Sequence, residues 1–196
     1  MLTEAATMIR QAHENGLISV TWIYPRGQAV LDEKDPQLIS GAAGVAVCIG
    51  ADFTKVNYPD AYEGMTRPES LGVAVEAAGR TGIICSGGGS LPPRDFLQRL
   101  HEQINISGAR GAATGRNIHQ KTTDEGVRMA AACHAIICEG ASVDDPDGQL
   151  DPSDTAEIGV IIHNLGGSSI EAPQAIFSTS DSSATFATLY VPTTLL

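Results

Sequence analysis

The sequence predicts an α/β protein built on a parallel β-sheet. From residue 1 to about residue 140, segments with helical character alternate with short strand-like runs, giving four βα units. The strand-like runs are almost continuously apolar, which is typical of parallel strands covered on both faces by helices. A doubly wound sheet and a section of a (β/α)8 barrel both satisfy this pattern, and periodicity alone does not choose between them.

The predicted strands are short apolar or β-branched runs that end at proline, glycine or small residues. The run "LISVTWIYP" ends at Pro25 and the run "ADFTKVNYP" at Pro59, whereas "TGIICSGGG" ends in glycines. The fourth run, "GARGAATG", consists of small residues. The four predicted strands cover residues 17–25, 51–59, 81–89 and 108–115.

The predicted helices lie before and after these strands. The first ends at Gly16, the fourth begins with a proline pair, and the third opens with a capping sequence, all of which are ordinary helix boundary signals. The segment "RNIHQ" predicts only a helical turn, which is followed by a long final helix. The predicted helices cover residues 3–16, 35–50, 67–79, 92–107, 116–120 and 123–140.

Composition narrows the classes of partner. The chain has 196 residues with 42% hydrophobic content, enough for one domain with a sizeable core. Its formal net charge of −11 argues against nucleic acid or an anionic membrane as the main partner. No stretch approaches the roughly 20 apolar residues of a membrane span, and the N-terminus lacks the apolar core of a signal peptide.

The cysteines predict a reducing compartment. All four lie in apolar surroundings without a CxxC pair, so we expect buried free thiols in a cytoplasmic protein. Cys133 and Cys138 are five residues apart and do not share a helix face, so the sequence favours no metal site.

The composition changes near residue 143. Residues 1–142 hold all four βα units and are expected to form the main domain. Residues 143–196 begin with the linker-like "SVDDPDGQLDPSD" and continue as a Ser-, Thr- and Ala-rich segment without Lys or Arg. That second part contains two or three possible β segments, and the sequence assigns it no role.

Lys55 is the first candidate for chemistry. It is one of only three lysines, and it lies inside an apolar strand. Because strand side chains alternate, Trp22 and Tyr24 share a face of the preceding strand, and all three side chains meet if both faces point into a barrel. A lysine removed from water loses proton affinity and becomes a nucleophile that forms Schiff bases with carbonyls. The alternative is a lysine that reaches solvent or pairs with Asp52 or Asp60.

Two glycine-rich segments follow successive strands. "CSGGGS" contains Ser86, Gly87 and Gly88, and "TGRNIHQ" contains Gly115 and Arg116. Glycine lets backbone N–H groups approach an anion, a helix N-terminus adds donors, and an arginine offers a fixed fork for phosphate oxygens. The sequence therefore predicts a phosphate site formed by two neighbouring loops. Neither loop has the Gly-Lys-Ser/Thr ending of a P-loop.

Four segments together resemble a known family. "WIYPRG", "GADFTKVNYP", "SGGGS" and "GARGAATGRNIHQ", in this order, resemble the archaeal-type class I fructose-1,6-bisphosphate aldolases of the wider DeoC-like aldolase group. The resemblance covers residues 5–142. It implies a (β/α)8 TIM barrel of which the four βα units correspond to strands 5 to 8.

The resemblance also implies a mechanism. Lys55 would form the Schiff base with dihydroxyacetone phosphate, Tyr24 would donate and accept the proton, and Trp22 would line the site. The phosphate would be held by Ser86, Gly87, Gly88, Gly115 and Arg116. The implied reaction is the reversible cleavage of fructose 1,6-bisphosphate to dihydroxyacetone phosphate and glyceraldehyde 3-phosphate, in glycolysis and gluconeogenesis, with no metal and no cofactor.

The chain departs from this family in two respects. The N-terminal half of the barrel has no counterpart here, and residues 143–196 match nothing in the family. A half barrel leaves two sheet edges unpaired and apolar surface exposed, so we expect a fragment or a self-associating homo-oligomer. Two alternatives stay open: a related aldolase that makes 2-amino-3,7-dideoxy-D-threo-hept-6-ulosonate, and a partial barrel that binds sugar phosphates without catalysis.

Overall fold

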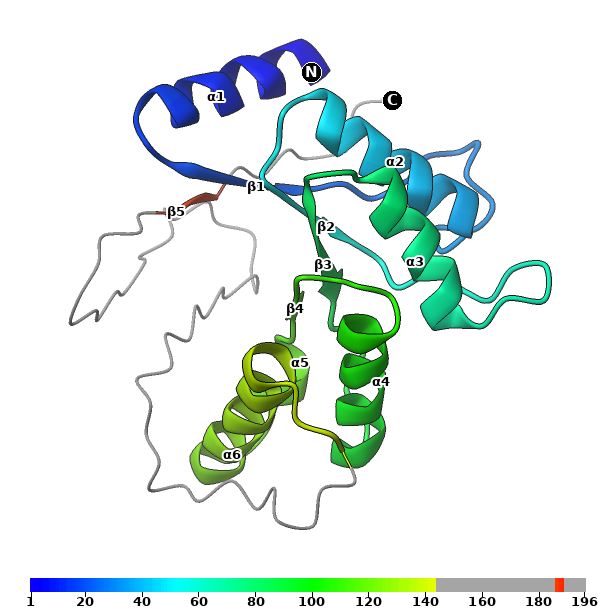
Figure 1. Cartoon of the computed structure of the whole chain (residues 1–196), viewed down its shortest axis with the longest axis vertical. Helices are drawn as coiled ribbons and strands as arrows, with labels where there is room; N and C mark the ends of the chain where they lie inside the picture. Colours follow the sequence, from blue (N-terminus) through cyan, green and yellow to red (C-terminus); the bar gives the residue numbers. More distant parts are fainter. Residues whose placement is uncertain (144–185, 189–196) are drawn as a thin grey trace.

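The computed structural model describes residues 1–143 and residues 186–188 of the chain (Figure 1). Its elements, in chain order, are α1 (Leu2–Glu14), β1 (Ile18–Trp22), α2 (Pro36–Cys48), β2 (Phe53–Val56), α3 (Arg67–Ala77), β3 (Gly82–Ser86), α4 (Pro93–Asn105), β4 (Gly111–Ala113), α5 (Arg116–His119), α6 (Thr123–His134), the π-helical turn η1 (Ala135–Glu139) and β5 (Phe186–Thr188).

The strands form one sheet in the order β4-β3-β2-β1-β5, and every neighbouring pair is parallel. In the register, Lys55 lies between Trp22 on β1 and Ile84 on β3. Because the strands are parallel, their carboxyl ends share one edge of the sheet, and the segments that follow them meet there. The predicted α/β architecture with four βα units is confirmed.

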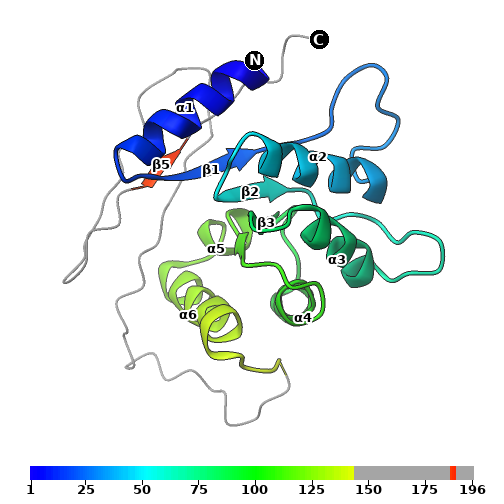
Figure 2. The same cartoon turned by 45° about the horizontal axis from the view of Figure 1, so that its top comes forward.

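The two faces of the sheet have different surroundings. On β2, Thr54 and Val56 are fully buried, whereas Phe53 and Lys55 are only partly buried. The buried face packs against α2 and α3, which lie side by side along it (Figures 1 and 2). Because α2 and α3 contribute several alanines and glycines, these helices can lie close to the strands. The core cluster contains Ile39, Ala43, Val56, Leu71, Ala74 and Ile83.

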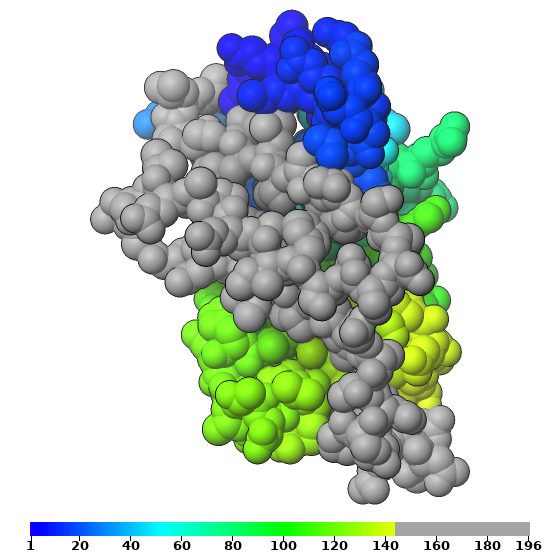
Figure 3. All heavy atoms as spheres, turned by 90° about the vertical axis from the view of Figure 1, so that its left-hand side faces the viewer, coloured from blue at the N-terminus to red at the C-terminus, as the bar shows by residue number. Residues whose placement is uncertain are grey.

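A second apolar cluster joins the last helices. It is formed by Phe96 and Leu100 of α4 with Met129 and Cys133 of α6 and Ile136 of η1. Seen from the side, α1 and the pair α5 and α6 lie at opposite ends of the described structure (Figure 3). This second cluster packs α4, which follows β3, against α6 and η1, which follow β4.

Side-chain caps fix where three helices begin. Asp35 accepts hydrogen bonds from the backbone N–H groups of the first turn of α2, which has proline at its first position. Thr66 with Glu69, and Thr122 with Glu125, form complete capping boxes at α3 and α6. The predicted starts of these three helices agree with these caps.

Strand ends and the final helix differ from the predictions. The strand predicted over residues 51–59 covers only Phe53–Val56, and the strand predicted over residues 17–25 ends at Trp22. The parallel pairing of β1 with β2 ends at the pair Trp22 and Lys55. The helix predicted over residues 123–140 is α-helical only to His134, after which its last turn widens into η1 and ends at Gly140 with a φ of 72°.

Two further predictions need correction. Cys85 and Cys133 are buried as expected, but Cys48 and Cys138 are exposed, because each lies on the outer side of a helical segment near its end. The edge of the sheet at β1 is not bare, since β5 pairs with it in parallel. Except for β5 and residue 143, the segment 143–196 lies outside the described residues.

Two kinds of feature are absent from the described residues. No helix there has the length and apolar character needed to cross a membrane. The same part of the chain brings together no group of three or more His, Cys, Asp or Glu side chains suited to a metal ion.

Candidate functional site

Lys55 stands on the sheet face opposite the α2–α3 core. Its Nζ lies 5.4 Å from the ring centroid of Trp22, its register partner on β1. The indole covers the amine from one side, and burial lowers the pKa of Lys55 below its ordinary value of 10.5. The predicted pairing of Lys55 with Trp22 is therefore present.

The carboxylates that could neutralise Lys55 are engaged elsewhere. Asp52 accepts hydrogen bonds from the backbone N–H and hydroxyl of Ser19, both 2.8 Å long, and its Oδ2 lies 2.8 Å from His13 Nε2. Asp60 pairs with Arg67 at 3.5 Å. Within the described residues Lys55 has no ion pair, so no carboxylate there opposes the lowering of its pKa by burial. This arrangement argues against the alternative in which Lys55 pairs with Asp52 or Asp60.

Tyr24 follows β1 by two residues, at the carboxyl edge of the sheet. Burial raises the pKa of its phenol to about 12, although the nearby positive charge of Arg26 acts in the opposite direction. The Arg26 guanidinium lies 5.2 Å from the Tyr24 ring centroid and binds Glu33, with Nε 3.0 Å from the carboxylate. Tyr24 is thus a protonated phenol at neutral pH. Arg26 links the segment that carries Tyr24 to Glu33.

The first glycine segment packs directly against the end of β4. Gly87 N–H donates a 2.8 Å hydrogen bond to the carbonyl of Ala113. A Cβ on Gly87 would lie 2.7 Å from that oxygen and 2.9 Å from Thr114 Cα, distances that no side chain tolerates. The N–H of Gly87 is therefore occupied, and this glycine serves close packing of the two loops rather than donation to an anion.

The residues on either side of Gly87 are Ser86 and Gly88, the other two predicted phosphate-binding residues of this segment. Ser86 Oγ donates to Asn57 Oδ1 over 3.1 Å, which ties the end of β3 to the end of β2. Gly88 has a φ of 68°, in the left-handed region that favours glycine. The chain thereby turns outward at the carboxyl edge of the sheet.

Asn117 is the residue that sequence reasoning missed. Its side chain is fully buried, and its Nδ2 donates to the carbonyls of Gly87 and Gly89 at 3.3 and 3.2 Å. Its Oδ1 accepts from the Leu91 backbone N–H at 2.9 Å. One amide group therefore fastens the first glycine loop to the start of α5. The available signal was an asparagine directly after Gly-Arg at a predicted helix start, where a polar side chain often bonds to backbone groups.

The second glycine segment forms the start of α5. Gly115 precedes the helix, and its carbonyl accepts from the N–H groups of Ile118 and His119. Arg116 is exposed at the first helical position. The two glycine segments are adjacent, as predicted from their positions after successive strands.

These features define a class of protein, one in which a parallel βα sheet carries a half-buried amine beside two glycine loops at its carboxyl edge. An amine of lowered pKa suits Schiff-base formation, and glycine loops suit a phosphorylated carbonyl compound. The chain belongs to the DeoC/LacD family of aldolases, since residues 1–121 match the sequence profile of that family. The expected family membership is thereby confirmed.

Curated relatives support this assignment. The chain is 57% identical over 145 residues to the fructose-bisphosphate aldolase/6-deoxy-5-ketofructose 1-phosphate synthase of Methanocaldococcus jannaschii, covering 74% of this chain and 46% of the relative. It is 37% identical over 139 residues to the class 1 fructose-bisphosphate aldolase of Halobacterium salinarum, covering 71% and 49%. The chain thus spans about half the length of the curated relatives it matches.

Solved structures of aldolases support the same family assignment. The fructose-bisphosphate aldolase of Slackia heliotrinireducens superposes with a TM-score of 0.71 at 58% identity, covering 74% of this chain and 46% of that one. A Schiff-base-forming fructose-1,6-bisphosphate aldolase superposes with a TM-score of 0.61 at 31% identity, covering 69% and 51%. The fold is therefore that of part of an aldolase barrel.

Proposed function

We propose that this chain carries the Schiff-base half of a class I aldolase that reversibly cleaves fructose 1,6-bisphosphate. The observation that carries the proposal is Lys55, a half-buried amine of lowered pKa, packed beside Trp22 at the carboxyl edge of a parallel sheet. Family membership and the names of the relatives supply the reaction class.

In the proposed mechanism, neutral Lys55 attacks C2 of the open-chain ketose, and the resulting carbinolamine loses water to give an iminium. Tyr24 protonates the departing hydroxyl and becomes a phenolate. The phenolate then accepts the proton of the C4 hydroxyl while the C3–C4 bond breaks and its electron pair moves into the iminium. This releases glyceraldehyde 3-phosphate and leaves an enamine, which Tyr24 protonates at C3 before hydrolysis frees dihydroxyacetone phosphate.

The C1 phosphate of the bound ketose, which stays with dihydroxyacetone phosphate after cleavage, would lie at the two glycine loops. Backbone donors at Ser86 and Gly88, with Gly115 and Arg116 from the second loop, are our proposed binding groups. Gly87 contributes by letting the loops touch. The proposed reaction uses no metal and no cofactor, because the iminium itself accepts the electron pair.

Three features of the whole protein belong to the same proposal. We infer a cytoplasmic location, a main unit over residues 1–142 with a separate segment over 143–196, and self-association into a homo-oligomer. The last is supported by the half-length match, since a partial barrel exposes surface that its relatives cover with their other half.

Reductive trapping tests the central claim. The chain is treated with borohydride in the presence of dihydroxyacetone phosphate, and the adduct is located by peptide mass spectrometry. Lys34 and Lys121 are the other two lysines and serve as internal controls. We expect the label on Lys55 alone. A label on either control lysine, or none on Lys55, contradicts the proposal.

The name of the Methanocaldococcus relative favours a second candidate reaction. Breaking the C3–C4 bond of a 6-deoxy-5-ketofructose 1-phosphate gives dihydroxyacetone phosphate and methylglyoxal, so synthesis would use the same enamine on Lys55. Offering the enamine glyceraldehyde 3-phosphate or methylglyoxal separates the two reactions. The acceptor that yields product identifies the reaction that this chain supports.

A further inference from the structure

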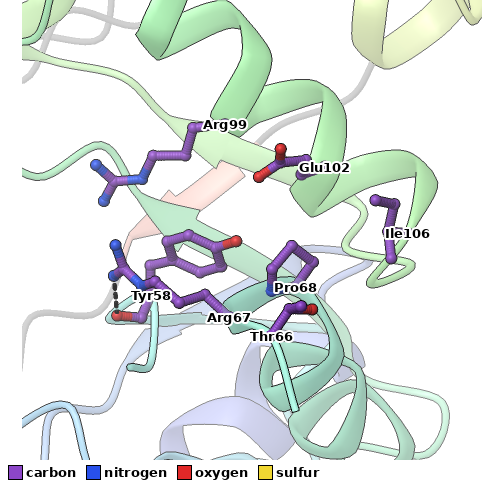
Figure 4. A pocket seen from close by; sticks show the side chains of 7 residues that line it. All are labelled: Tyr58, Thr66, Arg67, Pro68, Arg99, Glu102 and Ile106. Carbon is purple, nitrogen blue, oxygen red and sulfur yellow. Dashed lines mark hydrogen bonds between the residues drawn. The ribbon is translucent and has the colours of Figure 1, made fainter. Parts of the chain in front are cut away.

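A pocket of about 420 Å³ lies between α3 and α4 (Figure 4). Tyr58 forms its floor and continues the buried face of β2 that carries Thr54 and Val56, whereas Lys55 occupies the opposite face. Arg67 of α3 and Arg99 and Glu102 of α4 line the pocket. The mechanism proposed above uses none of these side chains.

The arginines place positive charge at one end of the pocket. Their guanidinium groups lie 4.3 Å (Arg67) and 5.1 Å (Arg99) from the Tyr58 ring centroid, on opposite sides of the ring and toward the same end (Figure 4). Arg67 also donates to the carbonyls of Pro59 and Tyr58 and pairs with Asp60.

Within the described residues, Arg99 lacks the hydrogen bonds and the ion pair that Arg67 makes. It makes neither a hydrogen bond nor an ion pair among those residues; its guanidinium contacts the Tyr58 ring and lies close to Gly88. Burial, reinforced by the positive charge of Arg67, lowers its pKa. A half-buried cation beside a second cation is costly, so this end of the pocket favours an anion.

The other end of the pocket is built for hydroxyl groups. Tyr58 is only 4% exposed, yet its hydroxyl has no hydrogen-bond partner within the described part of the chain. The hydroxyl points toward Glu102 (Figure 4). A buried hydroxyl left unpaired is unfavourable and rare in folded proteins. A ligand hydroxyl here would pair with Tyr58 and donate to the Glu102 carboxylate.

We propose that this pocket is a second binding site, for the phosphate monoester of a small polyol. The phosphate would lie between the guanidinium groups of Arg99 and Arg67, and the polyol hydroxyls would reach Tyr58 and Glu102. The carboxylate of Glu102 repels a second phosphate at that end, so the site discriminates against bisphosphates.

The proposed second site lies next to the first glycine loop of the candidate active site. A Cβ placed on Gly88 would lie 3.2 Å from a guanidinium nitrogen of Arg99, so the arginine packs against the glycine loop. A ligand that holds Arg99 therefore bears on the loop proposed to bind the substrate phosphate. This inference stands on the pocket alone and does not require the proposed aldolase reaction.

Titration calorimetry with glycerol 3-phosphate tests the proposal on the full chain. The Arg116→Met variant serves as background, because it removes the arginine of the proposed substrate site. We expect one binding event in this background. Adding Arg99→Met should weaken it by about tenfold or more, the usual loss for a hydrogen bond to a charged group. Adding Arg80→Met, an equal charge change on an exposed arginine, should leave it unchanged.

The Tyr58→Phe variant isolates the hydroxyl. It removes only an unpartnered group, so the fold is retained, and thermal melting confirms this. Binding of glycerol 3-phosphate should weaken by about two- to tenfold, while binding of inorganic phosphate should not change.

Three results would overturn the proposal: no binding event in the Arg116→Met background, equal effects of Arg99→Met and Arg80→Met, or a bisphosphate that binds as tightly as glycerol 3-phosphate. The fate of the aldolase proposal is read separately, from trapping at Lys55.

Discussion

The two sides of the candidate site are built by different means. On the β1–β2 side, the proposed chemistry rests on three side chains: Lys55 and Trp22, which are register partners, and Tyr24, which follows β1 by two residues. On the β3–β4 side, the proposed anion site rests on backbone groups whose positions are set by Gly87 and Asn117.

The difference shows how each side tolerates change. A nucleophile is one atom, so its loss removes the function while the sheet around it survives. A loop of backbone donors is held by many contacts, so its function declines gradually as those contacts are removed.

The largest effect is expected on the side-chain half. Lys55→Arg keeps the positive charge and the length of the side chain but removes the nucleophilic amine, because a guanidinium is not deprotonated in proteins. We expect borohydride trapping with dihydroxyacetone phosphate to fall to background. Lys34→Arg is the matched control and should trap as the unmodified chain does; residual trapping in Lys55→Arg would place the reactive amine elsewhere.

Tyr24→Phe should have the next largest effect. It removes the proposed proton carrier while preserving the ring, and general acid–base groups typically contribute about 10²–10⁴-fold. We expect the rate of adduct formation to fall within that range without loss of thermal stability. Tyr62→Phe removes a phenol that accepts a hydrogen bond from Gln37 of α2 and should leave the rate unaltered; a comparable loss there would indicate a general structural effect.

Asn117→Ala tests the backbone half. Three hydrogen bonds of a fully buried amide disappear, and Leu91 N–H and two glycine carbonyls lose their partner. The free energy of unfolding should fall by about 1–3 kcal/mol, measured by urea denaturation. The exposed Asn105 bonds only to the carbonyl of His101 on its own helix, so Asn105→Ala is the control.

The same variant separates phosphate binding from the chemistry of the amine. In Asn117→Ala, trapping should weaken with dihydroxyacetone phosphate but persist with unphosphorylated dihydroxyacetone. Equal losses with both ketones would show that the loop also supports Lys55.

The pH dependence should show the smallest change. Protonated Lys55 is unreactive, so adduct formation should rise with pH and level off above the pKa of the amine, with a midpoint below 10.5. Trp22→Ala opens the amine to water, which favours the charged form, so the midpoint should move upward toward 10.5. An unchanged midpoint would mean that the indole does not keep Lys55 dry.

Sequence patterns predicted most of the fold because its signals are local. Apolar runs, proline boundaries and capping sequences lie within a few residues of the elements they specify, and the strands β1 to β4 occur where they predict. Lys55 was conspicuous for the same reason, as a rare charged residue inside an apolar run. Its contact with Trp22 followed from alternation along neighbouring parallel strands.

The features that escaped prediction depend on distant partners. The role of Gly87 is decided by the carbonyl of Ala113, and that of Asn117 by a loop 26 to 30 residues earlier. The pairing of β5 with β1 joins segments from opposite ends of the chain. The exposure of Cys48 reflects which side of α2 meets the sheet, and a helix rich in small apolar residues gives little indication of that.

Asn117 has a consequence for the order in which the molecule becomes competent. During synthesis, β1 and β2 leave the ribosome well before α5, so the amine and its indole neighbour are assembled first. The first glycine loop has no amide to hold it until Asn117 emerges. Under the proposed mechanism, a nascent chain would therefore carry the Schiff-base amine before its phosphate-binding loop is held in place.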